Sequence, residues 1–293
     1  MKELQERKET ILAAIEEQGK LSDALKEQIL ACETKSRLED LYLPYKKRRK
    51  TKADIAREAG LEELTDKLIA DPNAAPEELA QAFITEGFED TKKALDGARA
   101  ILVDRFALDA DLVGEVRERM FTEGSMGAHV VEGKEAEGAK FKDYFDFNEP
   151  FHKLPSHRIL ALLRGENEGV LQLQLDAGDD ADYEDAIASR FELDRSSKWL
   201  ADAVHWGWRT KLYISSSLDV RMRLKEIAEE GALKIFATNL RDVLLAAPAG
   251  QRATIGLDPG YRNGVKCAVV DKTGKVLDTA IVYPHQPQNQ WSQ

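Results

Sequence analysis

The sequence predicts a mainly α protein, in which a multi-helical array is followed by the opening strands of an α/β domain. Apolar residues recur at helical spacing from the first turn to about residue 246. After Pro248 the spacing changes to a period of two, which is typical of strands. Hydrophobic residues make up 43% and charged residues 32% of the 293 residues, a globular composition.

The first region, residues 1–123, is predicted to be a series of short helices. Leu4, Ile11 and Ile15 form one helical face that ends at Gly19, and Ser22 is suited to cap the next helix. Further helices are expected at 35–42, 54–59, 61–70, 77–84, 90–106 and 110–121. Since no repeat period is found, we expect an irregular array and not a solenoid.

The second region, residues 124–247, mixes short strands with long helices. Strands are expected at 128–131 and 169–175, a helix at 155–163, and a solvated acidic loop at 176–185. Two long helices follow, at about 198–218 and 220–246. Their apolar positions are Leu200, Val204, Trp208, Leu212, Ile227, Phe236, Leu240 and Leu244.

The third region, residues 248–293, reads as strands at 253–257, 264–270 and 276–282, with a tight turn at 271–274. An α/β domain needs more elements than these three strands. We therefore expect the domain to be incomplete at Gln293, where the sequence stops.

Composition excludes several classes of protein. The formal net charge is -11, which argues against a surface that coats nucleic acid as a whole but not against one basic face. Cys32 and Cys267 suggest reduced thiols in the cytoplasm. No signal core or membrane span is expected. The five histidines show no metal spacing, so no metal site and no cofactor are predicted.

One run of basic residues stands out in this acidic chain. It contains Lys46, Lys47, Arg48, Arg49, Lys50 and Lys52, and Tyr42 and Tyr45 precede it. Such a run is suited to contact phosphates while the aromatic rings stack on bases. The alternative is a solvated loop with both tyrosines in the core.

Asp258 is the candidate catalytic residue. It ends the expected strand 253–257 just before a Pro-Gly turn, a place from which a carboxylate can hold Mg²⁺. The alternative is a residue that caps the turn, and the residues alone favour it. Two interpretations are open for the cluster of Trp199, Trp206 and Trp208. The rings could stack on bases or pack in the core, and packing in the core is favoured.

Several longer motifs stand out along the chain. They are LEDLYLPYK at 38–46, GAKFKDYF at 138–145, PSHR at 155–158, GLDPG at 256–260 and VVDKTGK at 269–275. In this order they resemble the Tex family of bacterial transcription accessory proteins. The last two resemble the start of the family's YqgF-type, RNase H-like domain. The resemblance spans nearly the whole chain.

The resemblance implies part of a transcription accessory factor that binds nucleic acid, with RNA as the expected ligand, and acts as a scaffold in transcription without catalysis. It also implies further C-terminal domains of the same protein, including an OB-fold, beyond Gln293. Asp258 matches the first metal-binding Asp of RuvC-like resolvases, which keeps a metal-dependent nuclease as the alternative. A third reading is a scaffold that docks on the transcription machinery or on ribosome-linked partners.

Overall fold

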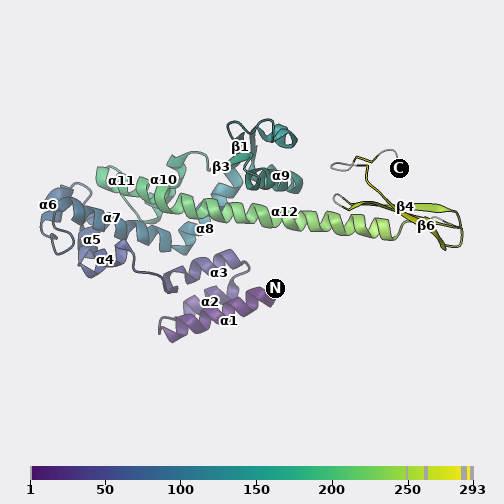
Figure 1. The fold of residues 1–293 in the computed structure, drawn as a ribbon. Helices are drawn as coiled ribbons and strands as arrows, with labels where there is room; N and C mark the ends of the chain where they lie inside the picture. Colours follow the sequence, from purple (N-terminus) through teal and green to yellow (C-terminus); the bar gives the residue numbers. More distant parts are fainter. Residues whose placement is uncertain (1, 249, 261–262, 285–288, 291–293) are drawn as a thin grey trace. The chain divides into compact units, whose positions relative to one another are not determined.

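The computed structural model describes residues 2–248, 250–260, 263–284 and 289–290. Among these residues it contains twelve α-helices and two three-stranded antiparallel sheets, which confirms the predicted mainly α class (Figure 1). The chain forms two compact units, Met1–Ala232 and Leu233–Gln293. The division into regions at residues 123 and 247 stays a prediction. None of the described helices is both long enough and apolar enough to cross a membrane.

The first three helices share a small core of their own. They are α1 (Lys2–Glu17), α2 (Asp23–Ala31) and α3 (Lys35–Tyr42), and a 3-10 turn, η1 (Leu43–Tyr45), follows them. Ile11, Ile15 and Leu38 are fully buried there. The Ser22 hydroxyl accepts a hydrogen bond from the Leu25 N–H at 3.2 Å, so the predicted cap is confirmed.

The next four helices pack around a second core. They are α4 (Lys52–Glu58), α5 (Leu61–Ala70), α6 (Pro76–Gln81) and α7 (Thr91–Leu108). A Cβ added to Gly97 would lie 2.4 Å from Leu61 Cδ1 and 2.8 Å from Phe88 Cε1. The lack of a side chain at Gly97 therefore allows α7 to approach its neighbours closely.

The third and largest core joins helices to a small sheet. The sheet has the order β2-β1-β3 and is formed by β1 (Ser125–Val130), β2 (Asp146–Pro150) and β3 (Leu171–Asp176). Its helical neighbours are α8 (Ala110–Glu123), α9 (Ser156–Asn167), α10 (Asp180–Arg190) and α11 (Lys198–Gly207). Two 3-10 turns, η2 (Ala139–Tyr144) and η3 (Phe151–Lys153), flank β2, a strand that the sequence did not predict. Side chains from Leu102 to Ala228 form this core, so it draws on both sides of residue 124.

The predicted acidic loop at 176–185 is wrong over most of its length, because α10 begins at Asp180. The Asp179 side chain accepts a hydrogen bond from the Ala181 N–H at 2.9 Å and caps the helix. Acidic residues in a first turn are favoured by the helix dipole. Tyr183 and Ile187, four residues apart, are buried and hold the helix on the core.

The predicted break between two long helices at residue 219 is also wrong. The interruption is a five-residue π-helical turn, η4 (Trp208–Leu212), and α12 (Tyr213–Leu244) runs on from it. The predicted positions Leu200, Val204, Trp208 and Leu212 are buried. Ile227, Phe236, Leu240 and Leu244 are exposed, because the buried ladder of α12 runs through Val220 and Leu224 and ends at Ala228.

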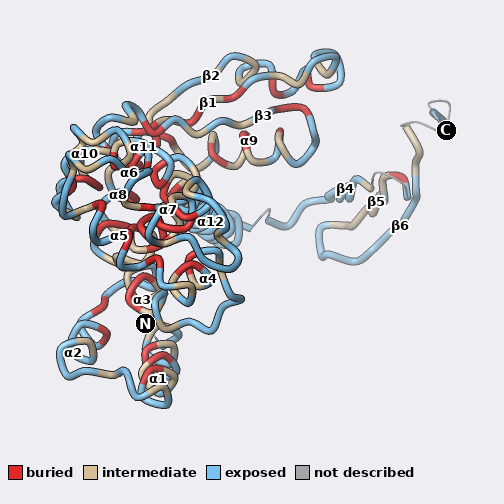
Figure 2. The backbone as a smooth tube through the Cα atoms, turned by 90° about the vertical axis from the view of Figure 1, so that its left-hand side faces the viewer, coloured by how far each residue is buried: buried red, intermediate tan, exposed pale blue. Residues whose placement is uncertain are grey.

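The second unit contains an antiparallel sheet of the order β4-β5-β6. Its strands are β4 (Thr254–Gly260), β5 (Gly264–Val270) and β6 (Val276–Val282), which confirms the three predicted strands. The Gly274 N–H donates to the Asp271 carbonyl oxygen at 3.1 Å in the predicted turn. Figure 2 shows buried residues throughout the helical unit, whereas β4 and β6 are mostly exposed.

Candidate nucleic-acid interface

The basic segment, residues 46–52, joins η1 to α4, and residues 46–50 are exposed. The backbone is extended at both ends of the link, with φ −67° and ψ 126° at Lys46 and φ −97° and ψ 169° at Thr51. Extended backbone of this kind makes no regular hydrogen bonds within itself. Contacts with the surrounding helices must therefore hold the segment in place.

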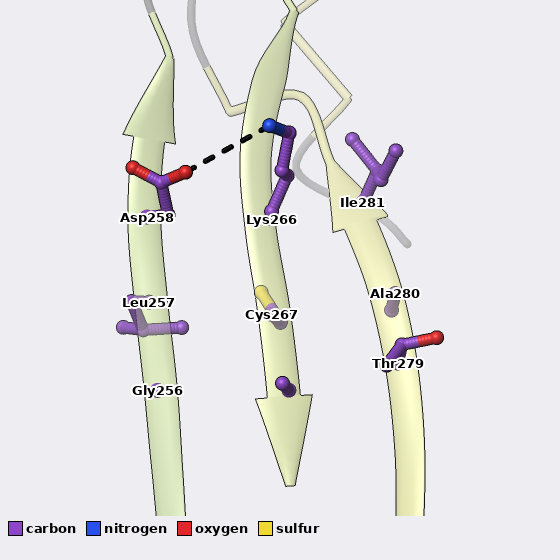
Figure 3. Close-up of a pocket in the computed structure, with 9 residues that line it drawn as sticks. Gly256, Leu257, Asp258, Lys266, Cys267, Thr279, Ala280 and Ile281 are labelled. Atoms are coloured by element: carbon purple, nitrogen blue, oxygen red, sulfur yellow. Dashed lines mark ion pairs between the residues drawn. The ribbon is translucent and has the colours of Figure 1, made fainter.

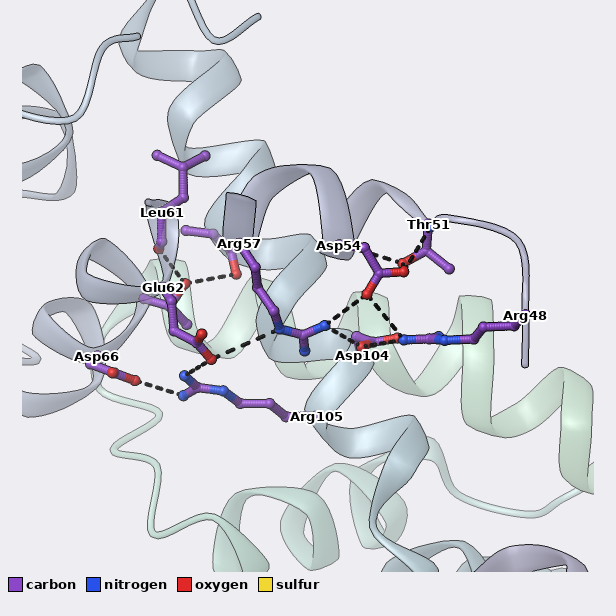
Figure 4. A network of polar contacts seen from close by, with 11 residues as sticks. Arg48, Thr51, Asp54, Arg57, Leu61, Glu62, Asp66, Asp104 and Arg105 are labelled. Carbon is purple, nitrogen blue, oxygen red and sulfur yellow. Dashed lines mark hydrogen bonds and ion pairs between the residues drawn. The ribbon is translucent and has the colours of Figure 1, made fainter. Parts of the chain in front are cut away.

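Two side chains tie the segment to distant parts of the chain. Gln18, the residue that follows α1, donates from Nε2 to the carbonyl oxygen of Tyr45, the residue just before the segment, at 2.9 Å. Arg48 Nη1 and Nη2 donate to Oδ1 and Oδ2 of Asp104 in α7 at 2.8 and 3.1 Å (Figure 4). This bidentate geometry is the strongest form of an arginine–carboxylate contact.

A capping box holds the end of the segment. The Thr51 N–H donates to Asp54 Oδ2 at 2.9 Å, and the Asp54 N–H donates to Thr51 Oγ1 at 3.2 Å. The two residues thus satisfy each other's backbone donors at the start of α4. Hydrogen bonds from Thr51 hold the pKa of the Asp54 carboxyl below its usual range.

Asp104 is the centre of a network of ion pairs. Its side chain is 10% exposed, and Arg57 Nη1 also donates to Oδ2, at 2.9 Å. Burial pushes the pKa of Asp104 upward, but the hydrogen bonds from Arg48 and Arg57 outweigh burial and hold that pKa below its usual range. Asp54 lies 3.4 Å from Arg48 and 3.3 Å from Arg57. Two arginines and two carboxylates therefore balance each other's charge.

The structure divides the six predicted basic residues into two groups. Arg48 pairs with Asp104, and Lys50 pairs with Glu58. The other four are exposed and make no ion pair with any residue that the structure describes; they are Lys46, Lys47, Arg49 and Lys52. Contact of these residues with nucleic acid stays a prediction.

The aromatic residues near the segment are half-buried. Tyr42 and Tyr45 pack against the core of the first three helices. The guanidinium of Arg7 lies 5.7 Å from the centroid of the Tyr42 ring, within cation–π range. These contacts favour packing for both tyrosines, and base stacking by them stays a prediction.

The tryptophans divide between core and surface. Trp208 is fully buried, its ring is stacked on Tyr183 at 4.1 Å between centroids, and its Nε1 donates to Asp180 Oδ1 at 2.7 Å. Burial raises the pKa of Tyr183 to about 12. Trp199 is half-buried, whereas Trp206 is 54% exposed, so the core expectation is wrong for Trp206.

Asp258 lies in β4, opposite Lys266 of β5, with 3.8 Å between Oδ2 and Nζ (Figure 3). Its side chain is 77% exposed beside a shallow hollow over the sheet. In the described part of the chain no three His, Cys, Asp or Glu side chains gather in a way that would hold a metal ion. The position thus offers one carboxylate, whereas two-metal chemistry needs several.

Sequence reasoning missed the partners of Arg48. Asp104 stands in the apolar stretch ILVDRF at 101–106, and an acid inside such a stretch is a signal that a buried partner exists. The identity of the partner is not readable from sequence, because Arg48 is 56 residues away.

Fold and site together define a multi-helical protein that presents an anchored basic segment and continues into an antiparallel sheet. Comparison with known families gives two matches. The Tex central region-like family matches residues 71–236, and the Tex protein YqgF-like domain matches residues 252–293. The chain belongs to the Tex family.

Individual relatives agree with this assignment. The transcriptional accessory protein Tex of Neisseria gonorrhoeae is 54% identical over 99% of this chain, and protein YhgF of Escherichia coli is 48% identical over 98%. The human S1 RNA-binding domain-containing protein 1 is 31% identical over 92%. The chain spans 39% of the length of both bacterial relatives and 29% of the human one.

Proposed function

We propose that this chain is part of a Tex-type transcription accessory factor that binds nucleic acid, with RNA preferred, through the basic segment. The observation that carries the proposal is the set of exposed cations at 46, 47 and 49, in a chain with a net charge of -11. Cations on a surface bind phosphates by releasing counterions. Two relatives support the proposal by name, one as a transcriptional accessory protein and one for an S1 RNA-binding domain.

In this proposal the helical unit is a non-catalytic scaffold that works in the cytoplasm. Its partners are nucleic acid, the transcription machinery and the remaining domains of the longer protein. A pull-down of polymerase that survives nuclease treatment would favour direct docking on protein over contact through RNA.

Filter binding of single-stranded RNA across a salt series tests the proposal. Replacing Lys46, Lys47 and Arg49 together by Ala should weaken binding and flatten the salt slope by about 0.7 for each phosphate that the protein no longer neutralises. The matched control replaces three exposed lysines elsewhere in the same unit, Lys20, Lys26 and Lys142. An unchanged affinity and slope in the first variant would exclude the basic segment as the site.

The YqgF-like match over residues 252–293 gives a second candidate, a metal-dependent nuclease with Asp258 as its first metal ligand. A cleavage assay with Mg²⁺ or Mn²⁺ on the longer protein, wild type against Asp258→Asn, separates the two proposals. Metal-dependent cleavage that the substitution removes would replace the non-catalytic proposal.

A further inference from the structure

We infer that Asp104 clamps Arg48, and that Arg48 positions the basic segment for phosphate binding without contacting phosphate itself. The inference rests on the proposed function of the segment. It assigns different roles to neighbouring basic residues that the sequence presents as one uniform run.

The clamp is built into the core of the helical unit. Asp104 belongs to α7, and its neighbours Ile101, Leu102 and Phe106 are fully buried. Both carboxylate oxygens are occupied, one by Arg48 alone and one by Arg48 and Arg57 together. Because Asp104 is fixed by the packing of α7, Arg48 can move only by losing its hydrogen bonds to that carboxylate.

Transfer of Arg48 from Asp104 to a phosphate would be costly. A carboxylate that is only 10% exposed would lose two of its three side-chain hydrogen bonds. Asp104 would keep only Arg57 as its charged partner, and we expect this loss at a mostly buried carboxylate to outweigh one solvent-exposed phosphate contact. Arg48 is therefore expected to stay on Asp104 when nucleic acid binds.

The positions of the contacts explain how the segment presents its other cations. The chain is held at Tyr45, Arg48 and Thr51, that is, at every third residue. Between these points lie two pairs, Lys46 with Lys47 and Arg49 with Lys50, and Lys50 is paired with Glu58. A segment that is ordered before binding loses less conformational entropy in the complex.

Asp104→Asn tests the inference, because the change in surface charge and the loss of the Asp104–Arg48 contact are expected to change RNA affinity in opposite directions. The substitution makes this face one unit more positive, so charge alone predicts tighter binding of a fluorescein-labelled oligouridine RNA. The clamp predicts binding about tenfold weaker, which corresponds to ordering roughly one backbone residue. The matched control is Asp96→Asn, which removes an exposed carboxylate from the same helix with no contact to Arg48.

A second variant, Arg48→Gln, serves in case Asp104→Asn disturbs the fold, since the Arg48 side chain is 37% exposed. The expected result is again weaker binding, with the salt slope unchanged because the same phosphates are contacted. A residue that binds phosphate directly would instead lower the slope by about 0.7, as Lys47→Ala should. Far-UV circular dichroism confirms that each variant is folded.

The outcomes separate the inference from the proposed function. Tighter binding by Asp104→Asn, or a slope for Arg48→Gln that falls like that of Lys47→Ala, overturns the clamp while the binding site stands. If replacing Lys46, Lys47 and Arg49 leaves affinity unchanged, the proposed function itself fails.

Discussion

The helical unit and the sheet of the second unit both carry periodic apolar residues, at helical and at strand spacing, but these residues differ strongly in burial. Leu64 of α5 is 0% exposed, whereas Leu257 of β4 is 65% exposed. By the strand register, Ile255 and Leu257 share one face with Cys267 and Val269, while Asp258 and Lys266 lie on the other. The difference teaches that a periodic pattern defines a face, but only a second packed layer buries it.

The largest expected effect is a direct break of this comparison. Leu64→Ala should lower the free energy of unfolding by about 3 kcal/mol, because it leaves a cavity in a closed core. Leu257→Ala should change it by less than about 0.5 kcal/mol, because that side chain is already hydrated. Urea unfolding followed by far-UV circular dichroism measures both. Equal decreases would show that the sheet face is covered in solution.

Ion pairs give the next largest contrast. Arg117 Nη2 lies 2.6 Å from Asp40 Oδ2, with side chains 8% and 9% exposed, and Asp219 also lies 3.0 Å from Arg117. Asp40→Asn should cost about 2–3 kcal/mol, because Arg117 keeps only Asp219 as its charged partner.

The exposed pair of Asp258 and Lys266 is the control for that experiment. Asp258→Asn should change the free energy of unfolding by less than about 0.5 kcal/mol, as is usual for surface pairs. A cost equal to that of Asp40→Asn would contradict the exposure of this sheet face.

Hydroxyl groups extend the comparison to smaller effects. Thr51→Ala removes the capping box of α4 and should cost about 1 kcal/mol. Thr273→Ala removes the hydrogen bond from Oγ1 to Asp271 Oδ1 at 2.6 Å in the exposed turn, and should cost less than about 0.5 kcal/mol. Thermal unfolding of the two variants ranks them, and the reverse order would be evidence against a structured start of α4.

The smallest effect appears only in acid. The pKa of Asp104 is lower in the folded protein than the value of about 3.9 expected on unfolding. Its contribution to stability is therefore fully present above about pH 4 and is lost as the pH falls through the folded pKa. The free energy of unfolding, measured with urea at a series of pH values below about 4, should therefore fall less steeply for Asp104→Asn than for wild type. Asp96→Asn is the control. If the free energy of unfolding decreases equally with falling pH in all three proteins, the ion pairs of Asp104 do not contribute to stability.

Local patterns were sufficient for much of the fold. Ser22 was identified as a cap, and the three strands of the second unit followed from the change of period after Pro248. The strand β2 was missed because its sequence, DFNEP, has poor strand propensity, and pairing with β1 overrides that propensity. The helix α10 was missed because its acidic first turn resembles a loop, although Tyr183 and Ile187 four residues apart were a readable signal.

The candidate site was predictable in position but not in internal arrangement. The run from Lys46 to Lys52 is visible as composition, so its exposure could be expected. The separate roles of Arg48 and Arg49 depend on Asp104, which is distant in sequence and reaches the segment only through the packing of α4 on α7. Sequence spacing carries no information on such a contact.

The π-helical turn at Trp208–Leu212 sets the rotational phase of everything that follows it in α12. Such a turn amounts to one residue inserted into an α-helix. Deleting one residue of the turn, such as Thr210, would therefore leave a regular helix with the later residues close to their present phase. Deleting the exposed Leu218 from the regular part of α12 would instead rotate the later residues by about 100° about the helix axis. Val220 and Leu224, both buried, would turn away from the core, and Arg221 and Lys225 would take their places. A one-residue deletion should therefore be tolerated better at the π-helical turn than in the regular part of α12 that follows it.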